Sequence, residues 1–203
     1  WDAQIHFEEA IFKDTLEWIK TTINSTSRKK INLILRIHPG EIKGFIKSRI
    51  SLYEELRKNL TSFEFDRLNI VKAEQELNSY KLAEKCDYSI VFGSKIGIEI
   101  AALGHKVIVV GDCWTREKKI TIDPSSIEEY KKILRLCEEG EFEFIPNKRR
   151  ALLFSYILFF EIMKEVPFIE KRENKDPQFK INFNSPAINK KDNKFYTFLN
   201  SEL

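Results

Sequence analysis

The chain has 203 residues, of which 42% are hydrophobic and 32% charged, a balance typical of a globular protein that buries one substantial core. Its formal net charge of +3, from 34 basic and 31 acidic side chains, is too close to zero to predict a nucleic-acid-binding protein. Three widely spaced cysteines form no disulfide framework and favour a reducing, cytoplasmic location.

The N-terminal part predicts a helix followed by a strand. Asp2 is a candidate cap for a helix over residues 3–23, because apolar side chains recur there on one helical face. These side chains are Phe12, Leu16, Ile19 and Ile23. The apolar run at residues 31–37 then predicts a central strand of a parallel sheet, which ends at His38 because Pro39 cannot continue the ladder.

The next elements continue the alternation of helices and strands. A helix is predicted to start at Ser48 or Ser51, either of which can cap it. A short strand follows at residues 68–71, and another helix at residues 77–86.

Residues 88–111 have the pattern of one βαβ unit, whose two strands we expect to be parallel. The unit consists of a strand at 88–92, a helix at 96–103, a stop at Gly104 and a strand at 107–110. Ser94 and Lys95 lie in the corner before the helix, where free N–H groups and the helix dipole suit a phosphate.

The C-terminal part predicts two further helices, at residues 127–137 and 148–164. The apolar run within the second is shorter than the roughly 20 residues that a bilayer span needs, so we expect a core or docking helix. Beyond it the pattern dissolves into polar residues. We therefore expect one domain over residues 1–168 and a polar C-terminal tail over residues 169–203, packed on the domain or partly disordered.

Strands that alternate with helices predict an α/β fold, a Rossmann-like open parallel sheet with helices on both faces. Ligands bind such sheets at the carboxyl ends of the strands. Residues 36–39 and 92–95 follow two predicted strands, so we expect them to converge on one crevice. Arg36 and His38 alternate along the chain and are expected to point to the same side.

Three stretches together resemble a known family. They are RIHPGE (36–41), NSYKLAEKCDYSIVFGSKIGIEIAALGHKVIVVGD (78–112) and TIDPSSIEEYKKIL (121–134). In this order they are similar to the C-terminal, donor-binding half of GT-B-type glycosyltransferases of bacterial capsule and surface-polysaccharide biosynthesis, Kdo transferases among them. The likeness runs from about residue 1 to residue 168 and leaves the tail unexplained.

The resemblance implies roles for particular residues. His38 would contact the donor phosphate and serve as a catalytic residue, as an imidazolium or a proton donor, with Asp2 a second catalytic candidate. The donor would be bound by Arg36, Ser94, Lys95, Gly97 and Glu99, with Glu99 on the ribose. Lys95 departs from the family pattern, in which a second hydroxyl residue often stands. Each residue also has a structural explanation, as a turn, helix-capping or solvated residue.

The resemblance also implies substrates and partners. The chain would be the nucleotide-sugar-binding domain of a metal-independent glycosyltransferase without a resident cofactor, and its donor a CMP-, CDP- or UDP-linked sugar. The acceptor would be a glycan or a lipid-linked glycan. The chain starts at Trp1 rather than Met, which suggests a fragment that lacks an N-terminal acceptor domain and is inactive alone. The parent protein would act in the cytoplasm, with peripheral association at the inner face of the membrane.

Two alternatives remain open at this point. The chain can be a non-catalytic nucleotide-binding or interaction module, or it can belong to a nucleotide-sugar epimerase of the same architecture. No grouping of His, Cys and Asp has metal-ligand spacing, so no metal site is predicted.

Overall fold

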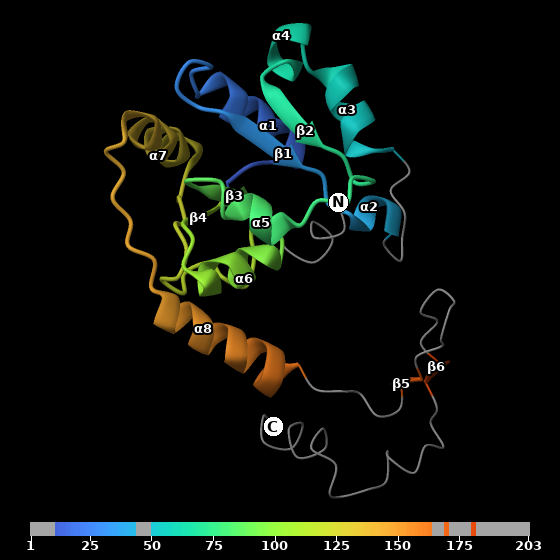
Figure 1. Cartoon of the computed structure of the whole chain (residues 1–203), viewed down its shortest axis with the longest axis vertical. Coiled ribbons are helices and arrows are strands. Elements are labelled where there is room, and N and C mark those ends of the chain that lie inside the picture. The colour runs from blue at the N-terminus through green and yellow to red at the C-terminus, as the bar shows by residue number, and fades with distance from the viewer. Residues whose placement is uncertain (1–10, 44–49, 164–168, 171–179, 182–203) are drawn as a thin grey trace, which may run out of the picture. The chain divides into compact units, whose positions relative to one another are not determined.

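The structure is a computed structural model that describes residues 11–43, 50–163, 169–170 and 180–181 (Figure 1). The chain divides into two compact units, Trp1–Leu152 and Leu153–Leu203, which are described separately. The predicted domain boundary after Phe168 and the predicted cap Asp2 both lie outside the described residues.

The first unit alternates strands and helices, as the sequence predicts. Its strands are β1 (Leu33–Arg36), β2 (Leu68–Val71), β3 (Ser89–Val91) and β4 (Val107–Val109). Its helices are α1 (Thr15–Asn24), α2 (Gly40–Lys43), α3 (Leu52–Asn59), α4 (Ser62–Phe65), α5 (Ser79–Ala83), α6 (Ile96–Leu103) and α7 (Ile127–Glu139). Helix α8 (Lys148–Tyr156) begins in this unit.

The described strands of this unit form two parallel pairs. β1 pairs with β2, with Leu33 opposite Leu68, and β3 pairs with β4, with Ser89 opposite Val107. Ile122 extends the second pair through a parallel bridge to Ile108. The α/β class with parallel strands is confirmed, and the ladders of the described residues are two-stranded.

Local capping chemistry sets where the helices begin and end. The predicted helix over residues 3–23 is wrong at residues 11–14, because Asp14 is extended and its carboxylate accepts the amide proton of Glu17 at 2.8 Å. Helix α3 starts at the predicted cap Ser51, which caps Glu54. Helix α6 ends as predicted at Gly104, whose φ of 95° is accessible to glycine at little cost.

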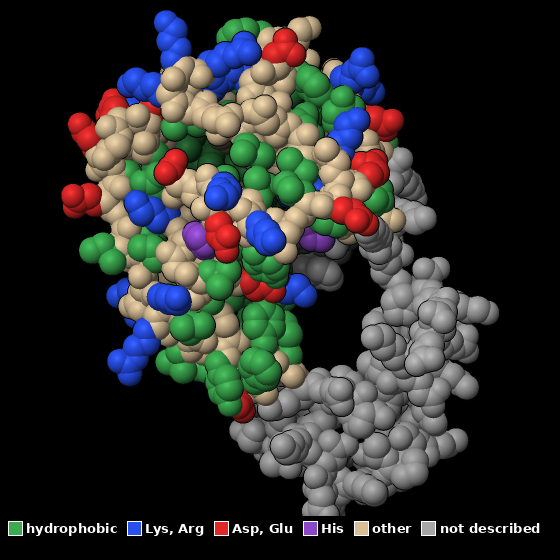
Figure 2. Space-filling model, in the orientation of Figure 1, with side chains coloured by type: hydrophobic (Ala, Val, Ile, Leu, Met, Phe, Trp, Pro, Cys, Tyr) green, Lys and Arg blue, Asp and Glu red, His purple; other side chains and the backbone are tan. Residues whose placement is uncertain are grey.

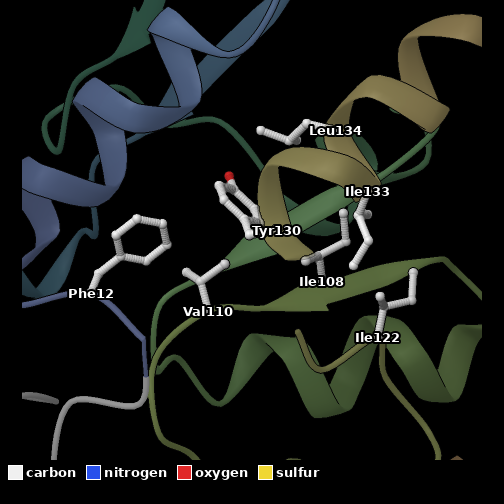
Figure 3. Packing of buried hydrophobic residues seen from close by; sticks show 7 residues of the cluster. All are labelled: Phe12, Ile108, Val110, Ile122, Tyr130, Ile133 and Leu134. Atoms are coloured by element: carbon white, nitrogen blue, oxygen red, sulfur yellow. The ribbon is translucent and has the colours of Figure 1, made fainter. Parts of the chain in front are cut away.

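One hydrophobic cluster lies between α7 and the β3–β4 pair. Figure 3 shows Tyr130 of α7 and Phe12 turned toward each other, with their rings edge to face at a centroid distance of 5.4 Å. The buried members are Phe12, Ile108, Val110, Ile122, Tyr130, Ile133 and Leu134. A second cluster, beneath the β1–β2 pair, consists of Ile19, Ile23, Leu56 and Leu60. Trp18 of α1 packs against both clusters.

The second unit contains the end of α8, a π-helical segment (Ile157–Ile162) and a two-residue antiparallel pair of β5 (Ile169–Glu170) with β6 (Lys180–Ile181). That pair falls in the predicted polar tail, most of which lies outside the described residues. Within the described part of the chain, no helix combines the length and the apolar character needed to cross a bilayer.

Candidate functional site

A cavity of about 300 Å³ lies at the carboxyl ends of β1 and β2, the edge at which parallel sheets bind ligands. Ile37 follows β1 directly, Lys72 and Ala73 follow β2, and all three line the cavity. The remaining lining residues come from α2, from α3 with its cap and from the loop after β2: Glu41, Ser51, Tyr53, Glu54, Arg57 and Glu74. The volume is at the lower end of the range for small-molecule sites.

Cationic and acidic groups face this cavity together. The ammonium group of Lys72 lies 4.0 Å from the centroid of the Tyr53 ring, a cation–π contact. The Glu41 carboxylate accepts the backbone N–H of Leu52 at 2.5 Å. This carboxylate therefore takes the place that a bound anion could have at the N-terminus of α3. Arg57 has no hydrogen-bond or ion-pair partner among the described residues, which leaves its guanidinium available at the cavity wall.

His38 lies in the turn that leaves β1. Its side chain is exposed, and its Nδ1 accepts the backbone N–H of Gly40 at 3.0 Å. Its Nε2 has no hydrogen-bond partner among the described residues. The turn itself is closed by the amide of Glu41, which donates to the His38 carbonyl at 3.0 Å. The ring is therefore held on one side and open on the other.

Arg36 performs a structural task at the same edge. Its guanidinium donates to the carbonyl of Lys72 at 2.5 Å and to that of Gln75 at 3.2 Å, which joins the end of β1 to the loop after β2. Its Nε is buried without a hydrogen-bond partner among the described residues. Arg36 therefore supplies positive charge near the edge while two of its nitrogens are committed to the backbone.

The start of α6 carries no side-chain cap among the described residues. Lys95 occupies the capping position with a φ of −55°, and its side chain accepts no N–H of the first turn. The Ser94 carbonyl accepts the amide of Gly97 at 3.1 Å, while the Ser94 hydroxyl has no partner in the described part of the chain. Ser94 therefore does not cap α6, although helix capping is the structural role expected for a serine in this corner. The amides of Gly97 and Ile98 already donate to the carbonyls of Ser94 and Lys95, at 3.1 and 3.0 Å, but a helix start without a side-chain cap, beside a hydroxyl and an exposed ammonium, can still accept an anion.

Gly97 and Glu99 hold α6 in place. A Cβ on Gly97 would lie 3.1 Å from Cγ2 of Val91, so glycine allows the helix to pack closely on β3. The Glu99 carboxylate accepts the hydroxyl of Tyr80 in α5 at 2.8 Å, and this hydrogen bond is the main cause that raises the pKa of Tyr80. One carboxylate oxygen of Glu99, the residue predicted to bind the ribose, therefore already accepts a hydrogen bond from Tyr80.

The structure brings the predicted residues to two strand ends. Arg36 and His38 lie at the end of β1, and Ser94 and Lys95 follow β3. No hydrogen bond of the described residues joins His38 to Ser94, and Asp2 lies outside the described residues. Nor do the described residues contain a group of three or more His, Cys, Asp or Glu side chains suited to a metal ion.

Several residues at these edges were not predicted from sequence. Gly40 contacts the His38 ring, Tyr80 bonds Glu99, and Tyr53 and Arg57 line the cavity. The partners lie up to 19 residues apart along the chain, so no local pattern reveals them. Glycine two residues after His38 is the one local signal, because it permits a close approach of the ring.

No protein-family profile, curated protein or solved structure matches this chain.

Proposed function

We propose that this chain is the nucleotide-sugar-binding domain of a GT-B-type, metal-independent glycosyltransferase of bacterial capsule or lipopolysaccharide biosynthesis. The observation that carries the proposal is the concentration of open donor groups at the carboxyl ends of parallel strands. These groups are His38 after β1 and the uncapped start of α6 after β3. The family resemblance of the three sequence stretches adds the reaction type.

In this proposal the described strands belong to one Rossmann-like open sheet. The parallel direction of both pairs supports it, as does Trp18, which packs against the clusters under each pair. An arrangement with β1 beside β3 brings the end of each strand to one edge. The donor phosphate would then bind between His38 and the N–H groups at the start of α6.

The chemistry proposed is electrostatic stabilisation of a leaving phosphate. As the glycosidic bond of the donor breaks, negative charge grows on the departing nucleotide. His38 would donate a hydrogen bond to that charge, while Lys95 and the α6 dipole would lower its energy. The resemblance favours a cytidine nucleotide, with a uridine nucleotide as the second choice.

Nucleotide titration tests the donor site. We expect CMP, CDP or UDP to raise the melting temperature and to shift amide resonances near His38 and Ser94. His38→Ala and Ser94→Ala should each weaken binding, whereas the matched variants His105→Ala and Ser62→Ala should not. A chain that responds to no nucleotide, or whose response survives both site variants, contradicts the proposal.

Turnover belongs to a separate experiment. The acceptor, a glycan or lipid-linked glycan, would bind an N-terminal domain of the parent protein, which we expect to associate peripherally with the inner face of the membrane. Sugar transfer is therefore measured with the parent chain. Isomerisation of the sugar nucleotide without acceptor would instead identify an epimerase, and nucleotide binding without either reaction would identify a binding module.

A further inference from the structure

The hydrogen bond between Gly40 and His38 determines which ring nitrogen carries the proton. A backbone N–H can only donate, so His38 Nδ1 must offer a lone pair to the Gly40 amide, 3.0 Å away. A neutral imidazole has one ring proton. That proton is therefore on Nε2, the nitrogen that has no partner among the described residues.

The position next to the ring admits only glycine without a change in geometry. A Cβ on Gly40 would lie 2.7 Å from Nδ1 and 2.9 Å from Cε1 of His38, closer than real Cβ contacts. The clash is with a movable ring rather than with backbone, so a larger residue would turn the ring and leave the main chain in place. The Glu41 amide holds the turn through the His38 carbonyl at 3.0 Å.

We infer that Gly40 is a positioning residue, which fixes His38 as the Nε2–H tautomer and presents that N–H to an acceptor oxygen of a ligand. The inference deepens the proposed function and depends on it for the identity of that ligand, the phosphate of a nucleotide. An Nε2–H group donates and has no lone pair, so it selects an anionic or carbonyl oxygen. The Gly40 bond is made only by an unprotonated Nδ1, so it is compatible with the neutral Nε2–H ring.

Nitrogen NMR of the free protein tests the tautomer without any ligand. At a pH where imidazoles are neutral, we expect Nδ1 of His38 to resonate as an unprotonated nitrogen and Nε2 as a protonated one. His105, whose ring has no partner among the described residues, is a control in the same spectrum and should show tautomer averaging. A His38 spectrum that matches His105, or shows the proton on Nδ1, overturns the inference.

Gly40→Ala tests the positioning role. We expect the His38 nitrogens to move toward the averaged pattern while the amide spectrum beyond residues 36–43 stays unchanged. Unchanged His38 nitrogens in this variant refute the role of Gly40. If the variant does not fold, the wild-type spectrum still decides the tautomer.

Amide replacements test the consequence for binding. The side-chain nitrogen of glutamine reaches the position of Nε2, and that of asparagine reaches the position of Nδ1. His38→Gln should therefore retain CMP or CDP affinity better than His38→Asn, which we expect to lose about tenfold or more. Equal loss, or the reverse order, contradicts donation from Nε2. If wild type binds no nucleotide, the proposed function fails, and the nitrogen spectrum alone judges the tautomer.

Discussion

Tyr130 shows how one buried hydroxyl joins two helices. Its side chain is fully buried, and its hydroxyl accepts Trp18 Nε1–H at 3.2 Å and lies 2.7 Å from the hydroxyl of Thr22. The single Thr22 proton goes to the Trp18 carbonyl at 2.8 Å, so Tyr130 is the donor to Thr22. All the groups are satisfied, which makes the arrangement costly to disturb.

Replacing Tyr130 with phenylalanine keeps the ring packing and removes the hydroxyl. The indole N–H of Trp18 then loses its acceptor and Thr22 loses a donor, so we expect the free energy of unfolding to fall by roughly 1–2 kcal/mol. Urea unfolding measures the change. Tyr53→Phe is the matched control, because the Tyr53 hydroxyl has no partner among the described residues. Equal effects of the two substitutions would contradict this account.

The same residue predicts how stability changes at alkaline pH. Burial raises the pKa of Tyr130 from its ordinary value of 10.0 to about 12. Between these two values the unfolded chain loses a proton that the folded chain keeps. The contribution of Tyr130 is therefore complete below pH 10 and decreases as pH rises toward 12.

Unfolding measured near the two ends of that window checks the sign. Wild type should lose stability between about pH 9.5 and about pH 11.5, and Tyr130→Phe should lose less over the same interval. The difference between the two proteins isolates Tyr130 from Tyr80 and Tyr88, whose pKa values are also raised. Parallel pH curves for wild type and variant would assign the loss to other groups.

At the scale of elements, two glycines determine how closely the parts of the βαβ unit approach. Gly97 lies where α6 crosses β3, and a Cβ added there would lie 3.1 Å from Val91 Cγ2. Gly111 follows β4 and lies against the backbone of Phe92, whose carbonyl oxygen would be 1.9 Å from a Cβ. The first contact is with a side chain that can move, and the second is with main chain that cannot.

Alanine at these two positions should therefore have unequal effects. Gly111→Ala must separate the ends of β3 and β4, and we expect a loss of about 3 kcal/mol or more, or failure to fold. Gly97→Ala displaces only a methyl group of Val91, and we expect about 1 kcal/mol. Thermal or urea unfolding ranks the two. A Gly97 variant less stable than the Gly111 variant would mean that the helix contact is the less adaptable one.

Local signals predicted the elements best where a single cap or stop decides the boundary. Helix α6 has its predicted bounds, because the corner before Ile96 and the left-handed Gly104 leave no alternative. The first helix is predicted wrongly at residues 11–14, because the spacing of Phe12 fits a helical face although its ring packs in the core before Asp14 caps α1. That tertiary contact cannot be predicted from the local sequence pattern.

The site was predictable only in part for the same reason. The sequence places His38 and Ser94 after strands, and the structure agrees. It does not reveal that Arg36 is bound by carbonyls of the β2 loop, or that Glu99 meets Tyr80. These partners are brought together by strand pairing and helix packing between segments 19 or more residues apart.

At the scale of the whole molecule, charge is distributed without one dominant sign. On the face shown in Figure 2, basic and acidic side chains are interspersed over the described residues, in keeping with a formal net charge of +3. Long-range attraction of the proposed anionic ligand would therefore be weak, and its recognition would depend on local groups such as Lys95, Arg57 and the start of α6.

The cohesion of the two parallel pairs depends on α1. Trp18 packs against the cluster under β1–β2 and against the cluster under β3–β4, and its ring lies 5.7 Å from that of Phe92. Its indole N–H also binds Tyr130. The other side chains of these clusters each belong to one cluster. We therefore expect Trp18 to couple the opening of one strand pair to the opening of the other.

We therefore expect Trp18→Ala to uncouple the pairs as well as to destabilise the chain, by about 3–5 kcal/mol. Native-state hydrogen exchange should give equal opening free energies for the core amides of β1 and β4 in wild type, and a lower value for one pair in the variant. Leu16→Ala and Ile133→Ala are the controls, since Leu16 packs on the cluster under β1–β2 and Ile133 belongs to the cluster under β3–β4. If both pairs still open together in Trp18→Ala, the coupling does not depend on this indole. Backbone contacts between the pairs, as in a single sheet, would then explain the cooperativity.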